Sequence, residues 1–212
     1  MTEASCPCCG SVTEHQAVNG LDTEQWQIDG SVLTTELPED LSLTLGRFLG
    51  TESVETLGGW VTAVRYRLDG ASITIDELCV IDDETDHWGL VDGKKYHFAC
   101  FYDAVILAAL VESPVDMRTE SPSGTVIEAR AVGSDELTVD PDEAVFSFGI
   151  DENVPRPPED GPGLEDGYAA ICPYVKAFPN QEAYEQWANS VHAATISMPL
   201  AGATELAAAL VK

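Results

Sequence analysis

Basic residues are scarce in this chain. Its 212 residues include 10 lysines and arginines against 37 aspartates and glutamates, a formal charge of -27 at pH 7. Duplex nucleic acid and anionic membranes bind through clusters of basic side chains, so this composition argues against both as partners. The acidic residues are spread over every segment, which indicates a solvated surface. Such a surface is typical of a halophilic protein, because screening over about 3 Å near molar ionic strength makes the charge tolerable.

Long apolar runs and targeting signals are also missing. No stretch approaches the ~20 apolar residues that a membrane helix requires. The N-terminus, MTEASCPCCG, has neither the basic start nor the apolar stretch of a secretion signal. We therefore expect a cytoplasmic protein, whose six cysteines are thiols, metal ligands or redox groups rather than a disulfide framework. The sequence has no Gly-rich phosphate loop, Ser-His-Asp ordering or HExxH motif.

The first half of the chain predicts a small helical module. Residues 1–35 are polar and irregular, with a possible hairpin around Asp29-Gly30. Apolar residues at helical spacing then predict helices near residues 41–49 and 54–68, and a third short helix near 75–79. A hairpin over residues 88–98, turning at Asp92-Gly93, would complete a winged-helix-like module at 36–98.

The second half predicts a sheet with flanking helices. Residues 99–111, ACFYDAVILAALV, are apolar on all sides, which indicates a buried helix. Alternating segments then predict antiparallel strands near residues 115–119, 125–132, 136–139 and 144–150. Prolines, glycines and acidic residues predict a long exposed loop at 151–167. A strand at 168–178, a helix at 181–190, a strand at 194–198 and a helix at 202–211 should follow.

The expected fold is therefore α+β: a small helical, winged-helix-like N-terminal module followed by a mostly antiparallel sheet flanked by helices. We place the limits of its parts at residues 1–35, 36–98 and 99–212.

Two cysteines and one aspartate form the candidate site. Cys100 lies where a predicted strand meets a predicted helix, and Asp103 shares one face of the first helical turn with it. The helix dipole favours a thiolate there, and the carboxylate can carry a proton between sulfur and a substrate atom. Cys172 follows the acidic loop, where it can reach a pocket beneath a lid. Together they suit a soft, thiophilic cation, although an isolated buried cysteine is also a common core residue.

The sequence around these residues resembles the organomercurial (alkylmercury) lyases. YHFACFYDAVILAALV is similar to the family segment in which an aromatic-rich strand leads to Cys-x-x-Asp and an apolar helix. In CPYVKAFPNQEAYEQW, Cys172 and Trp187 have the spacing of the family's second catalytic cysteine and a following tryptophan. The stretch SVHAATISMPLAGATELAAAL also resembles the family's C-terminal part. The resemblance covers about residues 88–212.

The resemblance implies a role for each of the three residues. Cys100 and Cys172 would hold the mercury of an R–Hg(II) substrate, and Asp103 would relay a proton to the departing carbon. Two thiolates make that carbon more carbanion-like, so a positioned acid can protonate it and yield RH and Hg(II). Such a lyase needs no redox cofactor, and cellular thiols or a mercuric reductase would accept the Hg(II).

Two other functions remain open for the same residues. The first is a non-enzymatic sensor or carrier that binds mercury or another soft metal through its cysteines. The second is a thiol–disulfide enzyme that uses Cys100 and Cys172.

A separate cysteine cluster lies at the N-terminus. Cys6-x-x-Cys9 resembles half of a zinc knuckle, and Cys8, Cys79 or His15 are the candidates to complete the four ligands of structural zinc. The same three N-terminal thiols are also suited to capture mercury and hand it on, or have no role. The other histidines are interpreted as core or interface residues rather than ligands: His87, His97 and His192.

Overall fold

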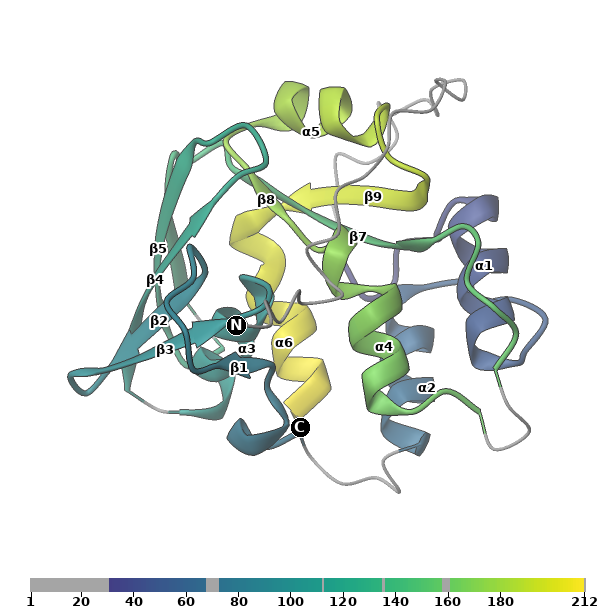
Figure 1. Cartoon of the computed structure of the whole chain (residues 1–212), viewed down its shortest axis with the longest axis horizontal. Coiled ribbons are helices and arrows are strands. Elements are labelled where there is room, and N and C mark those ends of the chain that lie inside the picture. The colour runs from purple at the N-terminus through teal and green to yellow at the C-terminus, as the bar shows by residue number, and fades with distance from the viewer. Residues whose placement is uncertain (1–30, 68–72, 112, 135, 158–160, 212) are drawn as a thin grey trace, which may run out of the picture.

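The computed structural model describes residues 31–67, 73–111, 113–134, 136–157 and 161–211. It has the expected α+β architecture, with a six-stranded and a three-stranded antiparallel sheet and helices packed between and beside them (Figure 1). The predicted N-terminal cysteine cluster and the possible hairpin at Asp29-Gly30 lie outside the described residues. Among the helices of the described part, none is long and apolar enough to cross a membrane.

The first two predicted helices are present. Helix α1 (Glu39–Leu49) buries one apolar face and ends at Gly50, whose φ of 73° is the left-handed geometry that glycine tolerates. Helix α2 (Leu57–Arg67) starts three residues later than predicted, and its expected end lies outside the described residues. The third helix is a short 3-10 turn, η3 (Ile75–Glu77), which the Glu77 carboxylate stabilises by accepting the N–H of Thr74 at 2.7 Å.

The larger sheet has the strand order β1-β3-β2-β4-β5-β6. Strands β2 (Trp88–Val91) and β3 (Lys94–Phe98) form the predicted hairpin, because Asp92 and Gly93 both adopt the positive φ of a tight turn. Its remaining strands are β1 (Val80–Ile81), β4 (Pro114–Glu120), β5 (Val126–Val132) and β6 (Glu136–Asp140). Since β2 also pairs with β4, the sheet runs across the expected limit at residues 98/99. The division into domains stays a prediction.

The predicted buried helix is α3 (Tyr102–Leu110), and residues 102–108 are all buried. It packs against the larger sheet and against the C-terminal helix α6 (Ala203–Val211), which follows the 3-10 turn η5 (Leu200–Gly202) (Figure 1). The Tyr102 hydroxyl donates to the backbone oxygen of Ala203 at 2.7 Å and joins the two helices.

The smaller sheet has the order β8-β7-β9. Strand β7 (Val145–Asp151), which follows β6 in sequence, leaves the larger sheet and pairs with β8 (Ala177–Phe178) and β9 (Ala193–Pro199). Its six residues before Asp151 are buried, as expected for a strand covered on both faces. Helix α5 (Gln181–Ala188) packs on this sheet and is capped by the side chain of Asn180.

The strand predicted at residues 168–178 is wrong. Helix α4 (Leu164–Ala170) and the 3-10 turn η4 (Cys172–Tyr174) occupy most of it, and only β8 is extended. The Asp166 carboxylate accepts the N–H of Gly163 at 2.7 Å, which stabilises the start of α4 and ends the predicted loop early. Pro173 has no N–H for a strand ladder but suits the first turn of a helix.

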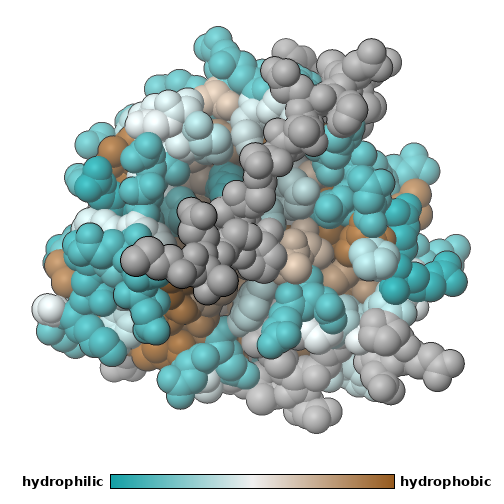
Figure 2. Space-filling model, in the orientation of Figure 1, coloured by the Kyte–Doolittle hydropathy of each residue, from teal (hydrophilic) through white to brown (hydrophobic). Residues whose placement is uncertain are grey.

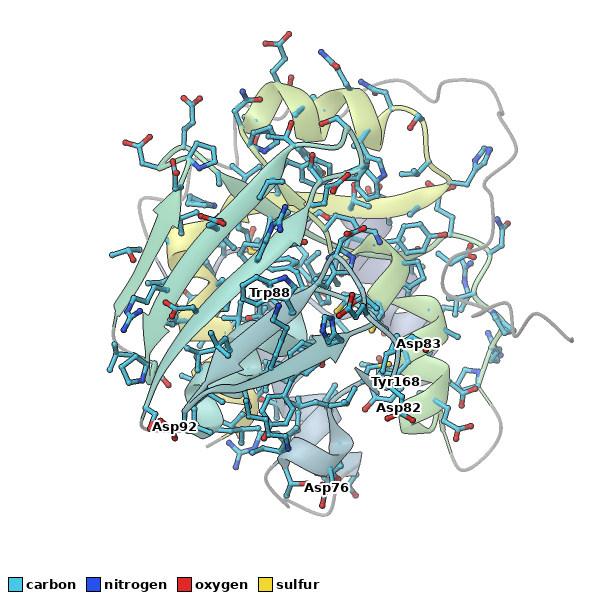
Figure 3. The ribbon with its side chains drawn as sticks, turned by 60° about the vertical axis from the view of Figure 1, so that its left-hand side comes forward. Asp76, Asp82, Asp83, Trp88, Asp92 and Tyr168 are labelled. Atoms are coloured by element: carbon cyan, nitrogen blue, oxygen red, sulfur yellow. The ribbon has the colours of Figure 1, made fainter. Side chains whose placement is uncertain are left out.

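The surface agrees with a solvated acidic protein. Most of the face in Figure 2 is hydrophilic, with smaller apolar areas. Four acidic residues around the larger sheet and η3 are exposed, as Figure 3 shows: Asp76, Asp82, Asp83 and Asp92.

Two helical glycines give a matched test of this packing. A Cβ at Gly46 would lie 2.7 Å from the Ser53 Cα and 2.8 Å from the Glu52 oxygen, whereas a Cβ at Gly59 would approach no closer than 3.5 Å, to Thr56. Gly46→Ala should therefore lower the free energy of unfolding by about 1–3 kcal/mol. Gly59→Ala should raise it by about 0.5–1 kcal/mol, because alanine favours the helix. Urea denaturation measures both, and shifts in the same direction would contradict the packing described.

Candidate active site

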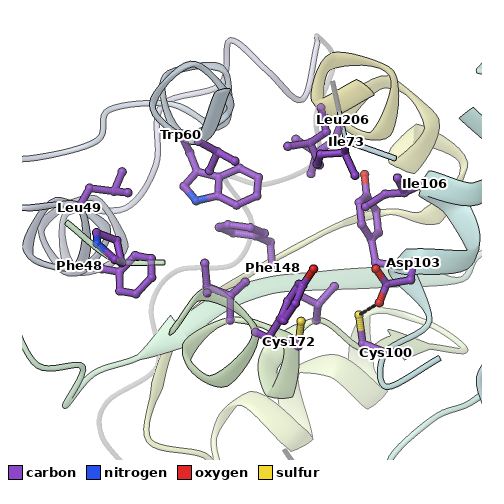
Figure 4. A pocket seen from close by; sticks show the side chains of 18 of the residues that line it. Phe48, Leu49, Trp60, Ile73, Cys100, Asp103, Ile106, Phe148, Cys172 and Leu206 are labelled. Carbon is purple, nitrogen blue, oxygen red and sulfur yellow. Dashed lines mark hydrogen bonds between the residues drawn. The ribbon is translucent and has the colours of Figure 1, made fainter. Parts of the chain in front are cut away.

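A cavity of about 240 Å³ lies between helices α1, α2, α3, α4 and α6 and strand β7. Figure 4 shows that Cys100, Asp103 and Cys172 lie toward one end of it and that Phe48, Leu49 and Trp60 lie toward the other. The three residues predicted as a site, although 72 positions separate the cysteines in the sequence, therefore line one cavity.

Cys100 and Asp103 are in direct contact. The Cys100 thiol donates to Oδ2 of Asp103 over 3.4 Å, and these residues are only 4% and 6% exposed. Cys100 lies between β3 and α3, just before the N-cap residue Phe101, and Asp103 is in the first turn of α3. Cys100 is therefore not on the helix itself, but its side chain still meets that of Asp103. The backbone N–H of Ala99 donates to the Cys79 oxygen at 3.0 Å and holds the preceding strand end against its neighbour.

The pKa of Asp103 is raised toward neutral pH. Burial raises the pKa of its carboxyl to about 6, although hydrogen bonds from the Cys100 thiol and the Cys79 backbone N–H act in the opposite direction. A carboxyl with this pKa can both accept and donate a proton under physiological conditions.

Cys100 is a thiol at rest. Hydrogen bonding to the Cys172 thiol, burial and the charge of Asp103 raise the pKa of Cys100 well above its usual value. The helix N-terminus, expected to favour a thiolate, is outweighed, because a helix dipole contributes at most about 2 kcal/mol. Ionising Cys100 therefore requires a cation at the sulfur or transfer of its proton to a neighbour.

Cys172 reaches the cavity from the 3-10 turn η4, not from the predicted strand. Cys172 is partly buried, whereas Cys100 is almost fully buried. The preceding helix α4 contributes Tyr168 to the cavity lining. The Tyr168 hydroxyl donates a hydrogen bond to the backbone oxygen of Glu77 and connects α4 to η3.

Sequence reasoning missed two features of this site. Cys79, considered there only as a zinc ligand, lies close enough to Asp103 and Cys172 that burial and their charges raise the pKa of its thiol to about 11. Trp60, which the sequence analysis did not single out, lines the cavity with Phe48 and Leu49. No motif in the sequence connects these residues to Cys100.

The other candidate ligands named from the sequence are the N-terminal cysteines and the histidines. Cys6, Cys8, Cys9 and His15 lie outside the described residues, so the zinc prediction stays a prediction. Within the described ranges, no group of three or more His, Cys, Asp or Glu side chains is arranged to hold a metal ion. His87 is hydrogen-bonded to Thr119 at 2.6 Å, and burial lowers its pKa to about 4.

Comparison with known proteins shows the family of this chain. The family model described as alkylmercury lyase (MerB) matches residues 81–212. The chain belongs to the alkylmercury lyase family. It is therefore a carbon–mercury lyase, and its substrates are organomercury compounds. The matched residues include the thiols and carboxyl of the cavity but not α1 and α2.

One similar solved structure is the mercury-bound form of MerB2. It is 13% identical with a TM-score of 0.47, and the alignment covers 82% of this chain and 91% of that chain. No curated protein matches this sequence.

The buried Asp103 predicts a pH-dependent stability. Its pKa is about 6 in the folded protein against an ordinary value of 3.8. Well below pH 3.8 the carboxyl is protonated in both the folded and the unfolded state, so its burial carries no ionisation penalty. As the pH rises toward 6, the Asp103 carboxyl ionises in the unfolded chain before it ionises in the folded protein. The free energy of unfolding therefore falls by up to about 3 kcal/mol relative to a chain without this carboxyl. The stability advantage of Asp103→Asn over the unsubstituted protein should therefore grow between pH 4 and pH 7.5.

Chemical denaturation over that pH range measures the difference. Asp116→Asn is the matched control, because that carboxylate is about half exposed. A difference for Asp103→Asn that does not change with pH would contradict the raised pKa.

Proposed function

We propose that this lyase cleaves the carbon–mercury bond by protonolysis, with Cys100 and Cys172 binding mercury and Asp103 moving the proton. The observation that supports this assignment is the 3.4 Å contact between the Cys100 thiol and Asp103, made beside Cys172 in one cavity. The reaction converts R–Hg(II) and a proton to RH and Hg(II), without a change in the oxidation state of mercury.

Capture begins at Cys172, the more accessible of the two thiols. Organomercurials reach the enzyme as R–Hg–SR′, bound to a small thiol. Exchange forms the Cys172 sulfur–mercury bond, breaks the bond to the small thiol, and transfers the Cys172 proton to the departing sulfur. The product of this step is R–Hg bound to Cys172 and free R′SH.

Cys100 then adds a second sulfur–mercury bond. Its proton passes along the hydrogen bond to the Asp103 carboxylate, which becomes a neutral acid. The pKa of about 6 suits this exchange, because the carboxyl is ionised in the resting enzyme at neutral pH yet accepts a proton readily.

Protonolysis completes the reaction. Asp103 returns its proton to the carbon, and the electron pair of the carbon–mercury bond forms the new carbon–hydrogen bond. RH leaves, Hg(II) remains between the two thiolates, and the Asp103 carboxylate is regenerated. Burial of the carboxyl limits competition from water as the proton donor. Cellular thiols or a mercuric reductase then accept the Hg(II).

The enzyme assignment separates this function from the other two hypotheses. A sensor or carrier would bind organomercurials without releasing a hydrocarbon. A thiol–disulfide enzyme would form a reversible Cys100–Cys172 disulfide as part of its cycle. Membership of the alkylmercury lyase family favours hydrocarbon release over both.

Removal of the proton relay should separate binding from cleavage. With phenylmercury and excess thiol, the unsubstituted protein should release benzene, measured by gas chromatography. Asp103→Ala should lower this rate by at least a hundredfold, because general acid catalysis contributes about 10²–10⁴-fold, while mercury still binds both thiols. Asp116→Ala, which removes a surface carboxylate paired with Arg130, should retain full activity. Mercury binding without benzene release by the unsubstituted protein would sink the proposed function.

The cysteines provide a second, matched series. Cys100→Ser and Cys172→Ser should each lose cleavage, because a hydroxyl is a poor ligand for a soft cation. Cys79→Ser should keep cleavage within about twofold, since the cavity lining includes the other two cysteines but not this one. Hydrocarbon release and mercury stoichiometry are measured for each variant. Equal losses in all three would contradict the assignment of two specific thiols.

A further inference from the structure

The end of the cavity away from the thiols has an apolar wall that the N-terminal helices provide. Phe48 and Leu49 come from α1, Trp60 and Val64 come from α2, and Phe148 of β7 lies between them and the thiols (Figure 4). Both helices precede residues 81–212, which the family model matches. The family match therefore covers the thiols and Phe148 but not the part of the wall that α1 and α2 provide.

Trp60 and Phe148 form the aromatic part of this wall. Their ring centroids are 4.9 Å apart at an interplanar angle of 65°, the edge-to-face geometry favoured by aromatic pairs. Such a pair presents ring faces and edges to anything that enters the cavity beside it. Another aromatic ring would complete the cluster through the same kind of contact.

The indole nitrogen of Trp60 is an unusual feature of the wall. Its Nε1 is buried, and within the described residues it has no hydrogen-bond partner. An unsatisfied buried donor is destabilising, and phenylalanine or leucine would fill space here without this cost. What tryptophan adds is a large flat apolar surface, which is useful where a flat ligand must be held.

The size of the cavity indicates how large the ligand is. A cavity of about 150 Å³ lined by leucine, isoleucine and phenylalanine binds benzene. The present cavity of about 240 Å³ holds one ring together with the mercury atom. A methyl group on mercury would leave the wall without contact and forfeit the dispersion energy that close packing supplies.

The chemistry of the lining indicates a neutral ring. Among the described residues that line the cavity, the ionisable groups are two cysteines, one aspartate and two tyrosines, and none of these residues is basic. An anionic substituent on the ring would therefore enter an apolar cavity without a counter-charge, at a cost of several kcal/mol.

We infer that this lyase prefers neutral arylmercury compounds and that Trp60 is the residue that sets the preference. The ring packs against Trp60 and Phe148 while Cys100 and Cys172 hold the mercury. This inference rests on the proposed function and adds the substrate class. Because phenyl and methyl carbon–mercury bonds differ in intrinsic reactivity, the effect of Trp60 is measured as a change in the ratio of kcat/KM for phenylmercury to kcat/KM for methylmercury.

The test measures kcat/KM for phenylmercury and methylmercury with excess thiol, by release of benzene and methane. Trp60→Ala should lower the phenylmercury value about tenfold and change the methylmercury value by less than twofold. Trp60→Phe should recover most of the loss. Trp88→Ala is the matched control, because that ring lies on β2 beneath Lys95, outside the cavity lining, and both values should stay unchanged.

A cavity-filling variant provides an independent arm that does not depend on removing a large side chain. Val64→Phe places a ring inside the cavity, so phenylmercury turnover should fall while methylmercury turnover persists. A phenyl-to-methyl ratio that neither Trp60→Ala nor Val64→Phe changes would overturn the inference and leave the proposed function standing. Release of neither hydrocarbon by the unsubstituted enzyme would overturn the proposed function and, with it, this inference.

Discussion

The contact between the buried Asp103 carboxyl and the Cys100 thiol is the interaction on which the rest of the structure depends. A carboxyl that is 6% exposed needs partners, and here they are the Cys100 thiol and the backbone N–H of Cys79. These partners require the end of β3, the segment before β1 and the first turn of α3 to meet at one point. The apolar residues of α3 then pack between the larger sheet and α6, which fixes the position of that turn (Figure 1).

The same contact explains why the resting site contains protons rather than two thiolates. Hydrogen bonding to Cys172, burial and the neighbouring charges raise the pKa of Cys100, and burial raises the pKa of Asp103. An empty site with several anions in an apolar cavity would be costly, so the proton that Cys100 shares with Asp103 limits the charge. On the proposed mechanism, the mercury cation replaces that proton at sulfur, and the proton becomes the reagent that cleaves the carbon–mercury bond.

Local sequence patterns predicted several of the helices and strands. Features that depend on contacts between residues far apart in the sequence could not be predicted in this way. Helix α1 and the β2–β3 hairpin follow from apolar spacing and from turn residues, and the Cys100–Asp103 contact follows from a spacing of three. The run around Cys172 reads as a strand because it is short and apolar. Long-range contacts such as Tyr168 to Glu77 favour a helix there instead. No local sequence pattern predicts that Trp60 lines the same cavity as Cys100, since 40 positions separate the two residues.

The Cys100–Asp103 contact could be predicted from the sequence and the apolar wall could not, because the two features meet different physical requirements. Proton transfer requires a hydrogen bond between particular atoms, which only a few residue types at a fixed spacing provide. An apolar wall requires only shape and volume, and many combinations of side chains from α1 and α2 satisfy that. The wall can therefore change between proteins while the reacting groups stay the same, because function is determined by individual sites on a shared fold. In this chain the residues proposed to react lie in the matched segment, and much of the wall lies before it. The inferred substrate preference therefore depends on a part of the sequence that the family model does not match.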